Sequence, residues 1–395
     1  MAVLRTGFDK VLILPRMLRA VVFAVATLGV AATAADPDSL RIEAGRRLFF
    51  DARLSEPPGT SCASCHDPAR AFTGDNGSGR AVARGSRPGE RGTRNSPTLM
   101  YLAGAPSFGW RERDGRRVPA GGLFWDGRAT SLADQARSPL LAANEMNNAS
   151  LAAVVAKVAA ADYAALLRAA WGDGVFATAD SAWTAIAASL ESYQRSAEFA
   201  PFTSKFDAVL REQARFTEQE ERGQSLFLIA QKGNCAACHT LNVDSRRPEE
   251  SLFTDFGYHV LGVPRNTEVA RTGEYDLGLC GPARGDLASE KQWCGSFRTP
   301  TLRNVARTAP YMHNGRFATL REAVAFYATR DTEPQRWYPQ GETFDDLPPP
   351  LRGNVDRDTR PYHRQPGQRP ALRDDEIDDI VAFLQTLTDG FSVRP

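Results

Sequence analysis

The sequence of 395 residues predicts a mostly α-helical protein that consists of two similar domains. Its length favours two domains of ordinary size. A helical pattern of apolar residues also recurs, as Glu43-x-Gly45-x-x-Leu48-Phe49 and as Glu221-x-Gly223-x-x-Leu226-Phe227. Each copy precedes a Cys-x-x-Cys-His pentad, and two later motifs recur in the same order. We therefore expect an internal repeat, with one domain at 35–205 and the other at 206–395.

Residues 1–34 have the features of a secretory signal peptide. Basic residues precede an apolar run at 20–32, and Ala32-Thr33-Ala34 fits the small-x-small pattern of a cleavage site. The run is too short to span a bilayer, and an uncleaved anchor is the alternative. The formal net charge is +1, and the signal holds three excess positive charges, which leaves the rest near −2. We expect a periplasmic protein without a membrane span after cleavage and without a nucleic-acid partner.

Further elements of the first domain follow its first helix and its pentad. Pro97-Thr98-Leu99 is the first of the recurring motifs. The glycine of Asp126-Gly127-Arg128 suggests a tight turn, and Ser131 can cap the helix that follows. Two Ala-rich helices, at about 149–171 and 180–196, then close the domain.

The second domain repeats this order. Thr217 and Glu220 form a capping box at the start of its first helix. Pro300-Thr301-Leu302 repeats the first motif and Asn314-Gly315-Arg316 repeats the turn, after which Thr319 can cap a helix as Ser131 does.

The end of the chain combines an irregular segment with a helix. Residues 331–372 are rich in Pro, Arg and Asp, which is typical of irregular surface. A terminal helix is expected at about 373–387. Its apolar stripe consists of Ile377, Ile380, Val381, Leu384 and Leu387.

The two pentads carry the chemistry of the sequence. Cys62-Ala63-Ser64-Cys65-His66 and Cys235-Ala236-Ala237-Cys238-His239 have the pattern of covalent haem attachment. In such sites both thiols bond to the haem and the adjacent histidine binds the iron. A zinc site or a disulfide is the alternative, but no set of four zinc ligands is visible. We expect two haems c, with His66 and His239 as proximal iron ligands.

The other two cysteines, Cys280 and Cys294, lie in a Gly-rich segment. In an oxidising compartment a disulfide between them is favoured. It would close a loop of about 15 residues and stabilise the protein by about 3 kcal/mol. Two buried free thiols are the alternative.

The repeat also makes the two haem sites unequal. Tyr327 follows His313 by fourteen residues, and Pro139 follows Trp125 by the same number. If the halves superpose, both positions face the open sides of their haems. Tyrosine can bind iron through its phenolate oxygen, whereas proline has no donor. Haem 2 would then be closed by His239 and Tyr327, although periodicity alone fits Tyr327 as an ordinary core aromatic.

With these features, the chain resembles the family of bacterial dihaem cytochrome c peroxidases and MauG. The resemblance covers nearly all of residues 40–390. It rests on both pentads, Gln135, Glu145, Leu123-Phe124-Trp125-Asp126-Gly127-Arg128, Thr299-Pro300-Thr301-Leu302-Arg303-Asn304 and Thr308-Ala309-Pro310-Tyr311-Met312-His313-Asn314-Gly315. It implies two mostly helical, cytochrome c-like domains with one haem each.

The resemblance separates two branches at the position of Tyr327. Ordinary peroxidases of the family carry methionine there, as a ligand of an electron-transfer haem, whereas MauG-like and MbnH-like proteins carry tyrosine. This implies that Tyr327 binds the iron of haem 2 and that Met312 and His313 do not. An anionic phenolate stabilises oxidised iron, so we expect haem 2 to be hard to reduce.

The same resemblance assigns roles to four residues of the first domain. Glu145 matches the catalytic acid/base, which moves a proton during peroxide cleavage, and Gln135 matches its hydrogen-bonding neighbour. Trp125 matches a tryptophan that relays electrons between the haems, and Pro139 would narrow the distal pocket. From the residues alone, Glu145 could be a solvated charge and Trp125 a packing residue.

Two further assignments come from the resemblance. Asn95, Thr308 and Pro310 match a calcium site between the haems. Calcium prefers oxygen ligands, so Asn95 would use its amide oxygen and the other two residues their main-chain oxygens, with water completing the shell. His259 matches a position near haem 2, where we expect a hydrogen-bonded structural histidine.

The leading functional hypothesis is a MauG-like enzyme. Hydrogen peroxide would bind at haem 1 and form a high-valent dihaem state, which oxidises aromatic residues, above all tryptophan, of a periplasmic partner protein. Residues 67–124 contain no histidine, so haem 1 is expected to be open without prior reduction. The alternatives are a cytochrome c peroxidase that takes electrons from a small redox protein, and a non-catalytic electron carrier. An open haem 1 argues against the carrier.

One departure concerns the route to the partner. MauG has a tryptophan six residues before its second proximal histidine, where this chain has Gly233. Trp293 and Trp337 are candidate surface relays instead, but the sequence does not place them.

Overall fold

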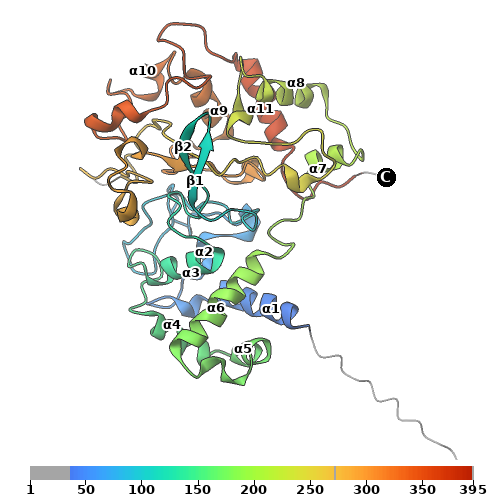
Figure 1. Ribbon diagram of the computed structural model, residues 1–395, viewed down its shortest axis with the longest axis vertical. Coiled ribbons are helices and arrows are strands. Elements are labelled where there is room, and N and C mark those ends of the chain that lie inside the picture. Colours follow the sequence, from blue (N-terminus) through green and yellow to red (C-terminus); the bar gives the residue numbers. More distant parts are fainter. Residues whose placement is uncertain (1–35, 271–272, 394–395) are drawn as a thin grey trace, which may run out of the picture. The chain divides into compact units, whose positions relative to one another are not determined.

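A computed structural model describes residues 36–270 and 273–393. The predicted signal peptide, 1–34, lies outside the described residues. Helices dominate, as predicted (Figure 1). Up to residue 200 the α-helices are α1 (Pro37–Phe50), α2 (Cys62–Cys65), α3 (Leu132–Leu141), α4 (Leu151–Ala159), α5 (Ala164–Trp171) and α6 (Ala179–Gln194). Beyond it they are α7 (Lys205–Leu210), α8 (Glu218–Leu228), α9 (Leu320–Thr329), α10 (Pro334–Trp337) and α11 (Asp374–Gln385).

Short 3₁₀ helices and two small sheets complete the described chain. The 3₁₀ helices are η1 (Ala52–Leu54), η2 (Pro68–Arg70), η3 (Asp173–Phe176), η4 (Cys235–Ala237), η5 (Pro248–Glu250), η6 (Pro282–Leu287), η7 (Lys291–Trp293), η8 (Val305–Arg307) and η9 (Pro349–Asn354). Strands β1 (Gly109–Arg113) and β2 (Arg116–Ala120) form an antiparallel hairpin in which Gly109 faces Ala120. Strands β3 (Tyr258–His259) and β4 (Phe297–Arg298) also pair antiparallel. No described helix combines the length and apolar character needed to cross a membrane.

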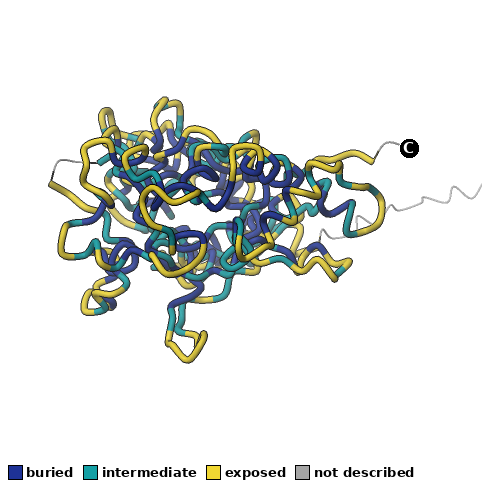
Figure 2. The backbone as a smooth tube through the Cα atoms, turned by 90° about the horizontal axis from the view of Figure 1, so that it is seen from above, coloured by how far each residue is buried: buried dark blue, intermediate teal, exposed yellow. Residues whose placement is uncertain are grey.

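Two large hydrophobic cores lie within residues 36–393. Apart from Leu252, the members of the first core lie between residues 42 and 202. The members of the second lie between 206 and 387. In Figure 2 the buried backbone runs through the interior, and the exposed segments are mostly loops around it.

The repeat is visible in the way each core brings two helices together. α1 crosses α6, and α8 crosses α11. A Cβ on Gly45 would overlap the carbonyl of Ser189, and one on Gly223 would overlap the carbonyl of Asp379. The repeated glycine thus lets two helix backbones approach closely. The crossings also place aromatic rings in edge-to-face contact, with centroids 5.5 Å apart in each of the pairs Phe49–Tyr193 and Phe227–Phe383.

The predicted helix at 149–171 is wrong as a single element, because α4 and α5 replace it. The break frees Asp162 and Tyr163 from helical geometry. The Tyr163 hydroxyl donates to Asp51 at 2.7 Å, and Asp162 forms ion pairs with Arg47 and Arg53. The second predicted Ala-rich helix, at 180–196, is present as α6.

The predictions for the end of the chain need one correction. The terminal helix is present as α11, and Phe383, which the predicted stripe omitted, is fully buried, whereas Val381 is only partly buried. Residues 331–372 are irregular apart from α10 and η9, but they are not merely surface. Six of their apolar side chains belong to the second core: Trp337, Tyr338, Phe344, Leu347, Val355 and Leu372.

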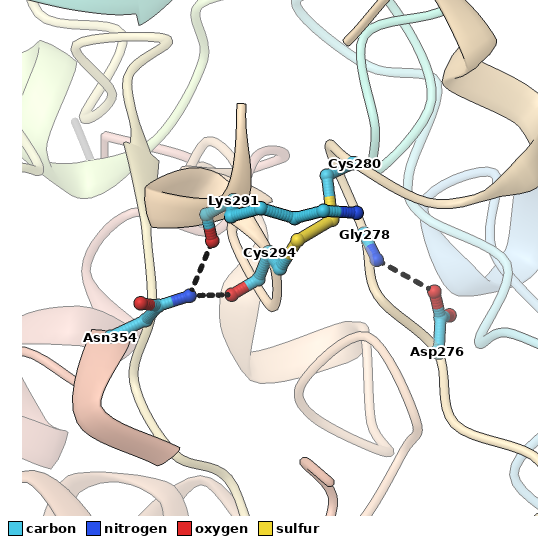
Figure 3. The surroundings of a disulfide bond; sticks show 6 residues. All are labelled: Asp276, Gly278, Cys280, Lys291, Cys294 and Asn354. Carbon is cyan, nitrogen blue, oxygen red and sulfur yellow. Dashed lines mark hydrogen bonds between the residues drawn. A yellow bond between two sulfur atoms is a disulfide. The ribbon is translucent and has the colours of Figure 1, made fainter. Parts of the chain in front are cut away.

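The predicted disulfide between Cys280 and Cys294 is confirmed. It ties η6 and η7 into one compact loop (Figure 3). The side-chain amide of Asn354 donates to the carbonyls of Lys291 (2.7 Å) and Cys294 (3.1 Å), so η9 also holds this loop.

Candidate active site

Both pentad histidines are anchored in the same way. Nδ1 of His66 lies 3.0 Å from the carbonyl oxygen of Phe72, and Nδ1 of His239 lies 3.0 Å from that of Phe253. A carbonyl only accepts hydrogen bonds, so each Nδ1 must carry the proton. This leaves Nε2 unprotonated as the metal-binding atom and fixes the orientation of the ring.

The Pro-Thr-Leu motifs support these anchors. The Thr98 hydroxyl donates to the carbonyl of Ala71, directly before Phe72, at 2.6 Å. The Thr301 hydroxyl donates to the carbonyl of Leu252, directly before Phe253, also at 2.6 Å. The recurring threonine therefore holds the loop that orients the histidine in each half.

The pentad cysteines form no disulfide. α2 carries Cys62 and Cys65, and η4 begins at Cys235. Burial raises the pKa of the Cys62 and Cys235 thiols to about 12, so these thiols are neutral. Zinc and other metals bind the thiolate, whereas covalent attachment to a haem leaves an uncharged thioether. The buried, unpaired thiols therefore fit haem attachment.

A cavity adjoins the second pentad and reaches residues of both halves. His239 and Tyr327 line it together with Trp125 and Asn95. Apolar side chains that suit a flat macrocycle supply much of its wall: Phe227, Leu302, Val305, Val324, Leu372 and Leu384.

His259 and Arg298 add polar atoms to this cavity. Nε2 of His259 is 3.8 Å from the carboxylate of Asp255, which is within the range of an ion pair but too long for a hydrogen bond, so the hydrogen-bonded histidine stays a prediction. Burial lowers the pKa of His259, but Asp255 and Cys238 outweigh this effect and raise it to about 10. Asp255 is the anionic partner of this buried cation, but Nε2 has no hydrogen-bond acceptor among the described residues. A haem supplies carboxylates, so the residues present fit this group.

Tyr327 lies on α9 with its side chain against the cavity. Its ring is 6.1 Å from that of Tyr362, and its hydroxyl makes no hydrogen bond to any described residue. Burial, followed by the nearby thiols of Cys238 and Cys235, raises the pKa of Tyr327. The phenol therefore stays neutral unless a cation approaches its oxygen.

Two other side chains, Met312 and His313, are alternatives to Tyr327 as the iron ligand, and they differ in the contacts that they already make. His313 is buried, its Nε2 lies 3.1 Å from Asp346, and its ring stacks on Phe297 at 3.6 Å. Met312 lines the cavity, as Tyr327 does. His313 is thus engaged with other groups.

The side chains that the sequence assigns to the first haem site lie on and after α3. Pro139 stands on α3, eight residues after its capping residue Ser131, just as Tyr327 stands eight residues after Thr319. Gln135 lies on the same helix and is half-buried, without a side-chain hydrogen bond to the described residues.

Glu145 follows α3 and is half-buried. Burial raises its pKa, and the charge of Arg128 opposes this only in part. Burial and then the charge of Glu145 raise the pKa of Cys65 to about 12, which places the carboxyl on the side of the first pentad. A carboxyl can accept and release a proton, and a raised pKa lets it hold that proton at higher pH than an exposed carboxyl does.

Trp125 connects the two halves. Its indole N–H donates to the carbonyl of Asn95 at 2.8 Å, and its own carbonyl accepts from the backbone N–H of Arg298 at 2.9 Å. It also lines the cavity beside His239, so a residue of the first half reaches the second pentad.

The predicted calcium ligands come together at the same place. The Asn95 amide nitrogen donates to the main-chain oxygen of Pro310 at 2.7 Å, and Thr308 lines the same cavity. An ion bound here would require the amide to present its oxygen instead.

Sequence reasoning missed an ionic network beside Trp125. Arg94 donates to Asp126 at 2.6 Å and to Asp276 at 2.6 Å and 2.7 Å, and Asp126 also binds Arg128. Arg94 precedes Asn95 in a recurring segment, which was a usable signal, but no pattern pointed to Asp276.

Comparison with known proteins supports the same architecture. The family model for di-haem cytochrome c peroxidases matches residues 39–215, and that for cytochrome c matches 220–388. The methylamine utilization protein MauG of Paracoccus denitrificans is 39% identical over 91% of this chain and 92% of its own length. The chain belongs to the MauG and di-haem cytochrome c peroxidase family. It therefore consists of two cytochrome c-type domains with two c-type haems and is a peroxide-dependent oxidoreductase.

Two other proteins are also similar to this chain over most of its length. The crystal structure of the diheme peroxidase BthA from Burkholderia thailandensis superposes with a TM-score of 0.84 at 44% identity, over 90% of this chain and 89% of that one. The cytochrome c551 peroxidase of Pseudomonas aeruginosa is 27% identical over 88% of this chain and 78% of its own length.

Proposed function

We propose that this di-haem protein uses hydrogen peroxide to oxidise aromatic residues, above all tryptophan, of a partner protein in the periplasm. The observation that carries this proposal is the pair Tyr327 and Pro139. Tyr327 lines the cavity of His239 with a hydroxyl that has no partner among the described residues, and Pro139 holds the equivalent place without any donor. A site closed by tyrosine stores oxidising equivalents, and a site left open admits peroxide.

When bound, the two haems would give two electrons to peroxide and would then hold the two oxidising equivalents that result. The protein supplies the proton movement. Cleavage of peroxide moves a proton from one of its oxygens to the other, and the Glu145 carboxyl can accept and return this proton. Gln135, one turn of α3 before Pro139, would orient the peroxide through its amide group.

Trp125 would share the two equivalents between the sites. Its indole ring lines the cavity of the second pentad, and its indole N–H is fixed by the carbonyl of Asn95. The indole is fixed by Asn95 of the first half, and the main-chain carbonyl of Trp125 is fixed by Arg298 of the second half. A side chain held in this way is suited to repeated electron transfer, because its surroundings need little rearrangement.

Calcium is the third cofactor that we assign, at Asn95, Thr308 and Pro310. An ion at this position would hold the loop that carries Trp125 to the second half. Removal of calcium with a chelator should slow the reaction with peroxide, and re-addition of Ca²⁺, but not of Mg²⁺, should restore it. A holoprotein that contains no calcium by elemental analysis would contradict this assignment.

The second candidate is a cytochrome c peroxidase that draws electrons from a small redox protein. The similarity to a cytochrome c551 peroxidase favours it. The two functions differ in their requirement for prior reduction of one haem.

The decisive experiment is to add stoichiometric peroxide to the fully oxidised holoprotein and to record its absorption spectrum over time. We expect a long-lived state with two oxidising equivalents, without prior reduction. A protein that reacts only after one haem is reduced would favour the second candidate. Mass spectrometry of periplasmic proteins, with and without this gene, would then identify the modified partner by its peroxide-dependent mass change.

A further inference from the structure

Electrons from a partner need a route to the cavity, and the neighbourhood of Gly233 does not offer one. A Cβ on Gly233 would lie 2.8 Å from the carbonyl of Leu226 and 3.1 Å from the sulfur of Cys235. No larger side chain fits there, and least of all an indole.

A continuous row of aromatic rings runs elsewhere, from the inter-haem region to the surface. The rings of Trp293 and Trp110 have centroids 6.3 Å apart, Trp110 and Phe108 are 6.3 Å apart, and Phe108 and Tyr258 are 5.9 Å apart. Together with Leu279 and Leu287 they form one hydrophobic cluster. Trp293 and Trp110 are partly exposed, whereas Tyr258 is buried.

The inner end of the row adjoins the cavity. A Cβ on Gly127 would overlap the Tyr258 hydroxyl, so this phenol rests against the turn that follows Trp125. Tyr258 also pairs with Arg298 across β3 and β4, and its neighbour His259 lines the cavity.

Three sets of contacts hold the rings of Trp293, Trp110 and Phe108 in place. Trp293 precedes Cys294, whose disulfide to Cys280 fixes the loop, and Asn354 binds the carbonyls on either side of it (Figure 3). Arg284, in the same loop, packs its guanidinium 4.0 Å from the Phe108 ring. Trp110 lies on β1, and Arg117 of the hairpin covers its ring at 4.5 Å. A rigid row of packed rings is what electron hopping requires.

We infer that Trp293 and Trp110 are relay residues through which single electrons enter the protein on their way to the haems, an inference that rests on the proposed function. Tryptophan can lose an electron and keep its indole proton. Within residues 36–270 and 273–393, the Tyr258 hydroxyl has only the carbonyl of Gly121 as a hydrogen-bond partner, at 2.7 Å, and a carbonyl does not retain a proton. The two indoles are therefore the stopping points, and Phe108 and Tyr258 form the bridge between them and the cavity.

The balance of the step is simple. One peroxide takes up two electrons and two protons and becomes two waters. Two single electrons thus pass along the row in each cycle, and each is lost by an aromatic ring of the surface donor. Without a donor the relay indoles are themselves consumed, because an indole that loses two electrons and takes up water gains one oxygen atom and releases two protons.

The test uses this self-oxidation. Holoprotein receives excess peroxide with no other protein present, and peptide mapping by mass spectrometry measures oxygen addition at each tryptophan. We expect modification of Trp293 and Trp110. Trp171 is the matched control, because it is also half-buried and also lies under a guanidinium, that of Arg41 at 4.4 Å, but belongs to no such row.

Two variants then test the order of the relay. Trp110→Phe should reduce oxidation of Trp293 to the level of Trp171, whereas Trp293→Phe should leave oxidation of Trp110 intact. Both should form the two-equivalent oxidised state normally and keep it longer. Equal oxidation of Trp293 in wild type and Trp110→Phe, or oxidation of Trp171 as great as that of Trp293, would overturn the relay while leaving the proposed function in place. Failure of the wild type to form the oxidised state would overturn both.

Discussion

Single residues decide how two similar halves differ. The anchors of His66 and His239 are the same in kind and in length, and a threonine supports each of them. The difference lies in the helix that follows the turn, where Pro139 and Tyr327 occupy equivalent positions. Under the proposed function, one backbone design would thus give an open site and a site with an oxygen donor.

Tyr327→Phe should therefore change only the second haem. Loss of the phenol oxygen removes a donor that stabilises oxidised iron, so the reduction potential of haem 2 should rise and the two-equivalent state should not form. Spectroelectrochemistry and the absorption spectrum measure both effects. Tyr362→Phe is the matched control, because its ring lines the same cavity 6.1 Å away. A variant Tyr327→Phe with an unchanged haem 2 would remove Tyr327 as a ligand.

Glu145→Gln should slow the reaction with peroxide by roughly 10²–10⁴-fold, since it removes a proton acceptor. The acceptor must be ionised, and burial raises the pKa of Glu145. The wild-type rate should hence rise as pH increases through this raised pKa, and the rate of the variant should not. Stopped-flow kinetics against pH measures this. Glu90→Gln, which alters an ion pair with Arg87 in a neighbouring loop, should behave as wild type. An unchanged pH profile in Glu145→Gln would contradict the role.

The residues that could be predicted are those whose role is visible in a short stretch of sequence. Each pentad is a motif of five consecutive residues, and Thr217 and Thr319 cap the helices that follow them, as expected. His259 was not predictable in the same way, because the absence of a hydrogen bond at Nε2 depends on strands and loops that meet only in the fold. Asp276 binds Arg94 across a separation of 182 residues, for which the sequence has no pattern.

Elements owe their arrangement to the two helix crossings. Gly223→Ala should destabilise the second domain, because its Cβ would overlap the carbonyl of Asp379 on α11. Overpacking of this kind costs about 1–3 kcal/mol in the free energy of unfolding. Chemical denaturation of the holoprotein measures this. Gly353→Ala, whose Cβ would meet nothing within 4 Å, should change stability by less than about 0.5 kcal/mol. Equal effects of the two changes would mean that the crossing does not need its glycine.

The boundaries of an element could be predicted only where the residues of that element decide them by themselves. The helix at α11 was expected because its apolar residues recur at helical spacing. The break between α4 and α5 was not, since alanine suits a helix and the break depends on Tyr163 reaching Asp51 of another element. Residues 331–372 looked like surface from their composition, but six of their apolar side chains fill the second core.

At the scale of the whole molecule, the two halves are joined by polar contacts around Trp125. Arg94 and Asp126 come from the first half and Asp276 from the second. Burial opposes ionisation of Asp276, but the charge of Arg94 outweighs it and lowers the pKa of Asp276 to about 2. This network holds the segment of Asn95, whose carbonyl accepts the hydrogen bond from the indole of Trp125.

Because of this ion-pair network, the free energy of unfolding should decrease at acid pH. The pKa of Asp276 in the folded protein lies below the value of about 3.9 in an unfolded chain. The ion pair therefore stabilises the fold fully above about pH 4, and this stabilisation is lost as pH falls toward about 2. Asp276→Asn should lower the free energy of unfolding by about 1–3 kcal/mol at pH 7, and the difference from wild type should shrink below pH 4.

Asp286→Asn separates this effect from a general loss of charge. Asp286 also pairs with an arginine, Arg284, but its side chain is 63% exposed, against 26% for Asp276. An exposed pair contributes less than about 1 kcal/mol, so this variant should unfold almost as wild type does. Asp276→Asn should also slow the exchange of electrons between the haems, because Arg94 adjoins Asn95, whose carbonyl holds the indole of Trp125. A variant Asp276→Asn that matched Asp286→Asn in stability and in electron exchange would show that the halves are held together elsewhere.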